Sequence, residues 1–345
     1  MHAGARHNTL SLGGIVKGGI PSALLVIVLM SSACISRLPP TPGPFPVEGV
    51  RQITSEYAFY QNLMWSPSGR LIAATRCPIL QFTPSCLGNE ETVLIDVSNG
   101  DSVTVSFQSL TPNRVSSYPV AWADSGDRLL LYLEESPTEA PAPPSQTTYR
   151  YLAYDPSTGG FMEIPVEGIP IDWDESSEQI LLIRANNEGV YELALYSYVS
   201  GDLAFELTLG EAGDLAGPHA LSPDGATLLR GDSPTDTRCN EISAYSIGSH
   251  SDFVPMLTMA CYPAWSQNGA KIAFARKDHP QGEPNQIMIA GSDGSDPQSL
   301  FGDQLIALLA SPTWSPDGSM IAFTRGGLEN ANAVYIVPVP ESMRP

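Results

Sequence analysis

Six segments of the chain repeat one pattern of apolar and polar positions. Each has a large apolar residue, a polar turn of the Ser-Pro-Asp-Gly type, and then a short apolar run typical of a strand. We call the large apolar residues the anchors; in chain order they are Trp65, Trp122, Trp173, Leu221, Trp265 and Trp314. Their spacing ranges from 44 residues (Leu221 to Trp265) to 57 residues (Trp65 to Trp122). This repetition predicts an array of similar structural units.

The turns and the apolar runs around them predict four strands in each unit. Proline presets φ at the first corner of a type I turn, and Asp and Gly suit the positions that follow, so the turn joins two strands in a hairpin. A third β-rich stretch follows each hairpin, and in the six units it begins at Thr92, Tyr149, Val190, Glu241, Asn285 and Ala333. A fourth, less regular strand then leads to the next anchor. Four strands in about 50 residues is the spacing of propeller blades.

The first strand of the repeat region is expected to complete the last unit. Residues 51–54 precede the first anchor, whereas the sixth unit has an anchor strand, its hairpin partner and a third strand at 333–337. Pairing the two removes an open blade edge. The sequence therefore predicts an all-β fold: a six-bladed β-propeller with four-stranded blades, closed by the N-terminal strand joining the last blade.

The repeat resembles a known family. The pattern W-S-P-D-G-x-x-I-A-F, clearest from Trp314 to Phe323, is similar to the WD40-like repeat of TolB-type propeller proteins and covers residues 50–340. The units at Trp122 and Trp173 lack the proline. The resemblance implies a propeller that binds other proteins of the cell envelope. The same repeat occurs in prolyl-oligopeptidase-type peptidases, but their nucleophile lies in a separate α/β domain, which we do not expect here.

Residues 1–33 have the pattern of a signal peptide. An apolar run of 11 residues, Ile20–Met30, follows the cations Arg6 and Lys17. The run is too short to span a bilayer comfortably and suits the hydrophobic region of such a peptide. The chain is therefore expected to be exported.

The cysteine that follows, Cys34, is the candidate site of lipidation. The preceding residues resemble a bacterial lipobox, although Ser31 stands where an aliphatic residue is usual. Cleavage by an ordinary signal peptidase and an uncleaved signal anchor are the alternatives. The Pro-rich segment 34–49 favours an extended tether. We expect a lipoprotein that faces the periplasm or the cell exterior, with the propeller at 50–340.

The other four cysteines suit an oxidising compartment. Cys77 ends a predicted second strand and Cys86 precedes the third strand of the same unit. Cys239 precedes a third strand, and Cys261 follows the antiparallel fourth strand. Of the three possible pairings, this geometry favours Cys77–Cys86 and Cys239–Cys261. Four reduced thiols are the alternative.

The acidic balance restricts the partners. The chain has 37 acidic and 17 basic residues and a net charge of −20, which becomes −22 when Arg6 and Lys17 are removed with the signal peptide. Such a surface repels phosphate backbones, so no nucleic acid is expected as a partner. We expect a monomer that binds an envelope protein or peptide.

Long, dissimilar connections between second and third strands all fall on one rim, the expected binding surface. Counting eleven residues from four anchors reaches an arginine, which suits recognition of carboxylates. The alternative is an inter-blade salt bridge to a neighbouring Asp or Glu, or simple solvation at the strand end. These speculative binding residues are Arg76, Arg184, Arg276 and Arg325.

No catalytic constellation is recognisable. The chain has no Gly-x-Ser-x-Gly elbow, no phosphate loop and no His-Glu-x-x-His, and His219, His250 and His279 belong to different units. No catalytic residue, cofactor or metal is therefore predicted, and the chain is expected to be a cell-envelope binding or scaffold protein rather than an enzyme. The alternative is an extracytoplasmic propeller enzyme, such as a metal-dependent hydrolase or lyase, with its site in the central channel.

Replacing the lipidation candidate tests the anchoring. Cys34→Ser removes the thiol that would accept the lipid, so the protein should leave the membrane fraction of fractionated cells. Retention of the variant in that fraction would contradict lipidation.

Overall fold

The fold is described from a computed structural model. It describes residues 48–55, 58–78, 90–111, 113–123, 127–137, 147–174, 178–185, 190–210, 219–231, 239–247, 252–280, 282–302, 308–326 and 332–345. Within these ranges every regular element is a strand except a short 3₁₀-helix, Glu341–Met343. None of the described segments is a helix with the length and hydrophobicity that a membrane crossing needs.

Four of the sheets have four strands each, which pair antiparallel in chain order. The second sheet of the chain comprises β6 (Arg114–Trp122), β7 (Leu129–Ser136), β8 (Thr148–Asp155) and β9 (Gly160–Glu163). The third comprises β10 (Ile169–Asp174), β11 (Gln179–Ala185), β12 (Tyr191–Ser197) and β13 (Leu203–Gly210). The fourth comprises β14 (His219–Leu221), β15 (Thr227–Gly231), β16 (Glu241–Ser246) and β17 (Val254–Thr258). The fifth comprises β18 (Ala260–Trp265), β19 (Lys271–Arg276), β20 (Gln286–Gly291) and β21 (Gln298–Gly302).

The remaining eight strands form one sheet. Its strands from the first unit are β2 (Ala58–Trp65), β3 (Leu71–Pro78), β4 (Glu91–Asp96) and β5 (Ser102–Thr104). Its other strands are β1 (Arg51–Gln52), β22 (Leu308–Trp314), β23 (Met320–Gly326) and β24 (Asn332–Pro338). The prediction of separate four-stranded sheets thus holds for four units. The first and last units are continuous because β2 pairs with β24 at Ala58 and Asn332.

The joint between β2 and β24 has its own hydrogen bonds. The Asn332 side chain accepts a bond from the Tyr60 amide (2.6 Å) and donates one to the Tyr60 carbonyl (2.8 Å). The amide side chain therefore substitutes for a strand residue in pairing with Tyr60. The short N-terminal strand β1 pairs antiparallel with β24, with Arg51 opposite Ile336.

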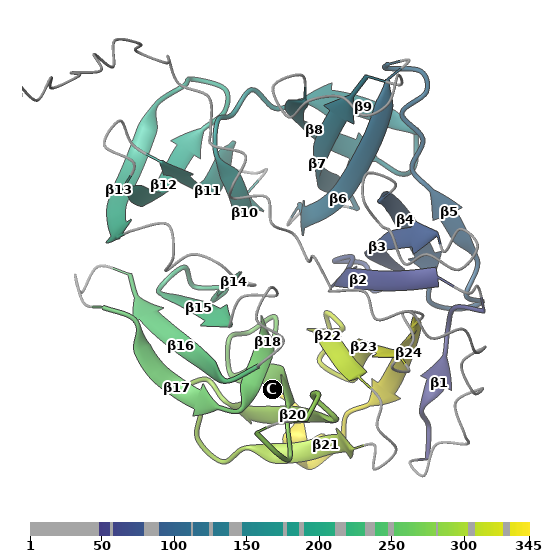
Figure 1. Ribbon diagram of the computed structural model, residues 1–345, viewed down its shortest axis with the longest axis vertical. Coiled ribbons are helices and arrows are strands. Elements are labelled where there is room, and N and C mark those ends of the chain that lie inside the picture. Colours follow the sequence, from purple (N-terminus) through teal and green to yellow (C-terminus); the bar gives the residue numbers. More distant parts are fainter. Residues whose placement is uncertain are drawn as a thin grey trace, which may run out of the picture.

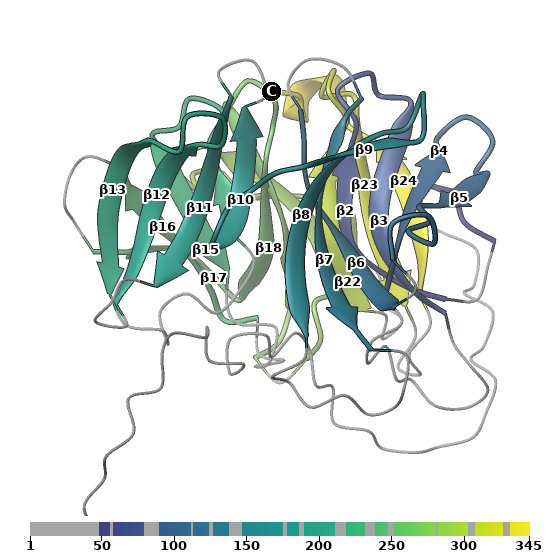
Figure 2. The same ribbon diagram turned by 90° about the horizontal axis from the view of Figure 1, so that it is seen from above.

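The sheets lie side by side around a common axis, in the arrangement of a propeller (Figure 1). The first strand of each unit is the innermost, and neighbouring innermost strands contact one another. These contacts run β2–β6–β10–β14–β18–β22, and β22 also contacts β2. The second strands run toward one rim, where the third strands begin (Figure 2).

The apolar core lies between adjacent sheets. Leu71 and Leu94 of the first unit, for example, pack with Leu129 and Leu131 of the second sheet. Each sheet therefore buries both faces, and burial of each large aliphatic side chain contributes about 1.5–3 kcal/mol.

The anchor tryptophans connect neighbouring units. The indole Nε1 of Trp122 donates to the Met64 carbonyl (3.1 Å), and that of Trp265 donates to the Ala220 carbonyl (3.1 Å). Both acceptors stand one residue before the anchor of the preceding unit. The indole Nε1 groups of Trp65, Trp173 and Trp314 are buried without a hydrogen-bond partner among the described residues. The need that all five anchor tryptophans share is therefore a large apolar ring.

The Ser-Pro-Asp-Gly turns are held by their own side chains. The Ser315 hydroxyl donates to Asp317 (2.7 Å) and accepts from the Met320 amide (2.9 Å), while Asp317 accepts from the Ser319 amide (3.0 Å). These bonds lower the pKa of the Asp317 carboxyl. The same three contacts recur in the turns that begin at Ser222 and Ser266.

Replacement of Asn332 tests the joint. Asn332→Ala leaves the buried N–H and C=O of Tyr60 without these partners, so the free energy of unfolding should fall by about 1–3 kcal/mol. Denaturant unfolding measures the change, with Asn99→Ala in an exposed turn as the control. Equal stability of the two variants would contradict the proposed role of the joint.

Candidate functional site

The four arginines of the predicted binding set lie at equivalent places, near the rim-facing ends of second strands. Arg76 lies in β3, Arg184 in β11, Arg276 in β19 and Arg325 in β23. Arg325 is buried, and Arg276 is half-buried opposite Gln286. Their role in binding stays a prediction.

Two of these arginines form ion pairs within their own sheets. Arg76 Nη2 lies 2.7 Å from Glu91 Oε2 and also donates to Thr104 Oγ1 (2.8 Å). Arg184 Nε lies 3.5 Å from Glu192 Oε2. Each glutamate is directly opposite its arginine on the third strand. Both pairs join strands of one sheet, whereas the salt bridge predicted as the alternative would join two blades.

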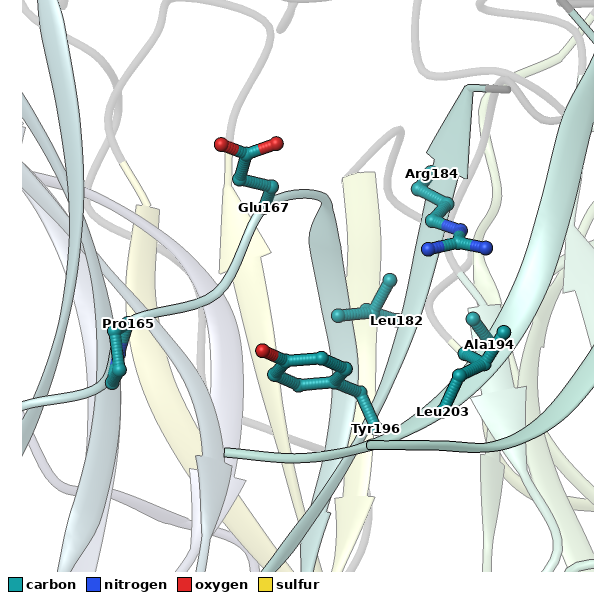
Figure 3. Close-up of a pocket in the computed structure, with 7 residues that line it drawn as sticks. All are labelled: Pro165, Glu167, Leu182, Arg184, Ala194, Tyr196 and Leu203. Atoms are coloured by element: carbon teal, nitrogen blue, oxygen red, sulfur yellow. The ribbon is translucent and has the colours of Figure 1, made fainter. Parts of the chain in front are cut away.

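Arg184 also lines a pocket in the third unit. The cavity has a volume of about 260 Å³ and an apolar lining from Pro165, Leu182, Ala194 and Leu203. Its polar groups are Arg184, Glu167 and the Tyr196 hydroxyl (Figure 3). Glu167 and Arg184 lie on opposite sides above the Tyr196 ring (Figure 3). The pocket thus combines an apolar floor with one group of each charge.

A glycine allows the chain to pass close to this pocket. Gly168 has φ +138°, and a Cβ there would lie 2.8 Å from both the Ile183 carbonyl oxygen and Leu182 Cδ1. The Gly168 carbonyl accepts a hydrogen bond from the Tyr151 hydroxyl of β8. The pocket therefore adjoins the second sheet across this segment.

A row of tyrosines crosses the second sheet beside the pocket. Tyr118, Tyr132 and Tyr151 are directly opposite one another on β6, β7 and β8. The Tyr132 ring lies 5.8 Å from that of Tyr118 and 5.3 Å from that of Tyr151, between centroids. It also stacks on the Tyr149 ring, with centroids 5.9 Å apart and 7° between the ring planes. Tyr149 is 40% exposed. We call these four residues the tyrosine cluster.

The other units show that the fold does not require this row. The triplets of residues at the same three cross-strand positions are Gln61–Thr75–Thr92, Ile169–Ile183–Leu193, Cys261–Ala275–Ile287 and Ala310–Thr324–Val334. None of them contains an aromatic side chain. The tyrosines are thus a departure from the repeat, a signal that comparison of the units in the sequence could have found.

Two adjacent glutamates of β7 have contrasting surroundings. Glu135 accepts hydrogen bonds from Thr111 and Asn113, and its Oε2 lies 3.7 Å from Arg150 Nη1. Glu134 points to the opposite face, where its contact is the Tyr132 hydroxyl at 3.4 Å. Within the described part of the chain Glu134 has no ion pair.

A second carboxylate lies near Glu134. Glu90 is 6% exposed and accepts a hydrogen bond from the Ser116 hydroxyl (2.9 Å), and Ser116 is directly opposite Glu134. Burial and the charge of Glu90 raise the pKa of Glu134 to about 7. Burial and the same carboxylates raise the pKa of Tyr118 as well. The tyrosine cluster therefore adjoins two carboxyl groups that raise the pKa values of their neighbours.

One of the predicted disulfides is present. Cys239 and Cys261 are joined, with their Cα atoms 4.9 Å apart. Cys77 is disulfide-bonded too, but Cys86 lies outside the described residues, so the pairing of these two stays a prediction. Cys34 and the residues before it also lie outside the described ranges. Among described residues, no group of three or more His, Cys, Asp and Glu is placed to hold a metal ion.

Comparison with solved structures identifies the architecture. The WD40 repeats of RRP9 superpose with a TM-score of 0.51 at 10% sequence identity, covering 86% of this chain and 99% of that one. The fold is that of a β-propeller. Neither a comparison with protein-family models nor a search of curated proteins gives a match.

Other similar structures include a TolB protein and a lyase. TolB from Acinetobacter baumannii has a TM-score of 0.47 and 15% identity, and the match covers 85% of this chain and 66% of the TolB chain. Oligogalacturonate lyase from Vibrio parahaemolyticus has a TM-score of 0.49 and 11% identity over 86% of this chain and 94% of the lyase. The absence of catalysis stays a prediction.

The raised pKa of Glu134 predicts a pH-dependent stability. The carboxyl changes from a pKa of 4.5 when unfolded to about 7 when folded, so the folded state retains a proton over this window. The stability it contributes is complete below the lower value and is lost as pH rises through the higher one. Melting temperatures should therefore fall less steeply between these pH values in Glu134→Gln than in the wild type. Glu163→Gln, an exposed site on β9, is the control, and identical profiles in all three proteins would contradict the shift.

Proposed function

We propose that this chain is an exported β-propeller that binds a partner in the cell envelope through the seam between its second and third sheets. The observation that carries the proposal is the juxtaposition at this seam of the pocket around Arg184 and Glu167 with the tyrosine cluster. Apolar pockets with a few convergent polar groups are the usual form of ligand sites. Tyrosine is also a frequent anchor residue of protein interfaces.

We infer that the propeller is a closed ring of six blades, with the eight-stranded sheet counting as two. The six repeats, the cyclic contacts of the innermost strands and the pairing of β1 with β24 support this count. A closed ring holds the seam rigid, because each blade is fixed by two neighbours. Rigid support of a few variable surfaces is the usual way in which such scaffolds bind.

The remaining parts of the proposal concern location and partner. Lipidation at Cys34 and the Pro-rich tether would hold the propeller close to a membrane surface. The net charge of −20 favours a partner with a basic surface and disfavours nucleic acid. The partner is an envelope protein or peptide, and the propeller acts as a monomer.

Pocket variants test the binding function. Glu167→Ala combined with Tyr196→Ala removes two polar groups from the pocket, so a partner cross-linked to the wild-type protein in cells should be recovered at least about tenfold less. Val254→Ala changes an exposed apolar residue of β17, 59% exposed, and serves as the matched control. An unchanged partner with the pocket variant, or equal loss with the control, would contradict the proposal.

A further inference from the structure

The tyrosine cluster adjoins two carboxyl groups for which the described part of the chain provides no cation. Glu134 and Glu90 form no ion pair there, whereas Glu135 on the opposite face of β7 is paired with Arg150. Carboxylates removed from water without a cation are costly, and proteins normally pair them. The two faces of one strand therefore differ in whether their carboxylates are neutralised.

Neighbouring segments of the sequence add no cation. Residues 79–89 and 138–146, which connect β3 to β4 and β7 to β8, contain no Lys, Arg or His. Arg114 is on β6 but is exposed and opposite Ser136. The causes of the raised pKa of Glu134 are burial and the charge of Glu90, with no cation among them.

The tyrosine rings supply the second part of a cation site. An ammonium group is attracted to the face of an aromatic ring, and the attraction grows as the site is desolvated. Tyr132 and Tyr149 stack in parallel, and Tyr149 is 40% exposed, so its ring is accessible from solvent. Glu134 is directly opposite Tyr149 on the neighbouring strand. A cation over the Tyr149 ring would thus meet a carboxylate at the same place.

Comparison with the other units shows that the fold does not require an acidic residue beside an aromatic row. The residue twelve positions after the anchor is Glu134 in the second unit. The equivalent residues elsewhere are Cys77, Ala185, Ser233, Lys277 and Gly326. The acidic side chain and the aromatic row thus occur together in one unit only. Tyr132 and Tyr151 also pack in the apolar core between the second and third sheets, whereas Glu134 takes no part in that core.

We propose that the tyrosine cluster, with Glu134 and Glu90, is a binding site for a primary ammonium group. The group belongs either to a free alkylamine or to a lysine side chain of the partner. Tyr149 provides the ring face, Glu134 the ionic contact and the more buried Glu90 additional negative potential. The inference deepens the proposed binding function and relies on it only for the identity of a natural ligand.

Direct titration with defined probes tests this site in the purified full-length exported protein. The probes are n-butylammonium, matched with uncharged n-butanol, and the blocked peptide Gly-Lys-Gly, matched with Gly-norleucine-Gly. Saturation-transfer NMR and titration calorimetry should detect binding of at least one charged probe and weaker or no binding of its neutral match. Binding of both charged probes indicates that a free amine suffices, and binding of the peptide alone indicates a lysine of a protein partner. Binding of neither would overturn the proposal.

Matched variants locate the binding. Glu134→Gln should weaken it about tenfold or more, as expected for loss of a charge-assisted contact. Tyr149→Leu should weaken it severalfold and Tyr149→Phe should preserve it, because the ring face is retained. Glu163→Gln removes the same charge from the same sheet and should leave it unchanged. Equal effects of Glu134→Gln and Glu163→Gln would overturn the proposal.

The two levels of the proposal fail in different ways. Glu134→Gln removes a half-buried charge and should not impair folding, which a thermal melt checks. If the charged probes do not bind but the pocket variant still loses its cellular partner, the binding function stands and the ammonium site is wrong. If the probes bind and the partner is unaffected by the pocket variant, the ammonium site stands and the proposed binding function is wrong.

Discussion

Burial of both faces of every sheet against its neighbours is the constraint on which the structure depends. A four-stranded sheet with two apolar faces is not stable alone, so each unit requires a neighbouring unit against each face. Trp122 serves this requirement twice, because it packs between sheets and donates to the Met64 carbonyl of the preceding unit. Sequence variation is then tolerated where sheets do not contact one another, which is chiefly at the rims.

The joint between the first and last units follows from the same constraint. Two surfaces from opposite ends of the chain must meet, and main-chain pairing between β2 and β24 is limited to one position. The Asn332 amide extends that pairing by bonding to both main-chain groups of Tyr60. The buried N–H and C=O of Tyr60 are thereby satisfied, as buried backbone groups nearly always are.

Much of this architecture could be predicted from the sequence, because repetition displays it six times. The strands, the turns, the pairing of the N-terminal strand with β24 and the Cys239–Cys261 disulfide all follow from spacing and turn chemistry. The tyrosine cluster was not predicted, because the prediction used the positions that all units share and the cluster is a feature of one unit. The cross-strand partners of Arg76 and Arg184 depend on the register between second and third strands. The sequence does not determine this register, because the path of the loop that joins the two strands is not known from it.

The pairing of Arg51 with Ile336 also affects how the chain acquires its structure. The first and last described strands, β1 and β24, complete one sheet together, so the fold cannot finish until both have been synthesised. Contacts so distant in sequence form slowly. If the chain is exported, as proposed above, and crosses the membrane unfolded, this delay would help it, since no completed propeller would exist to obstruct its passage.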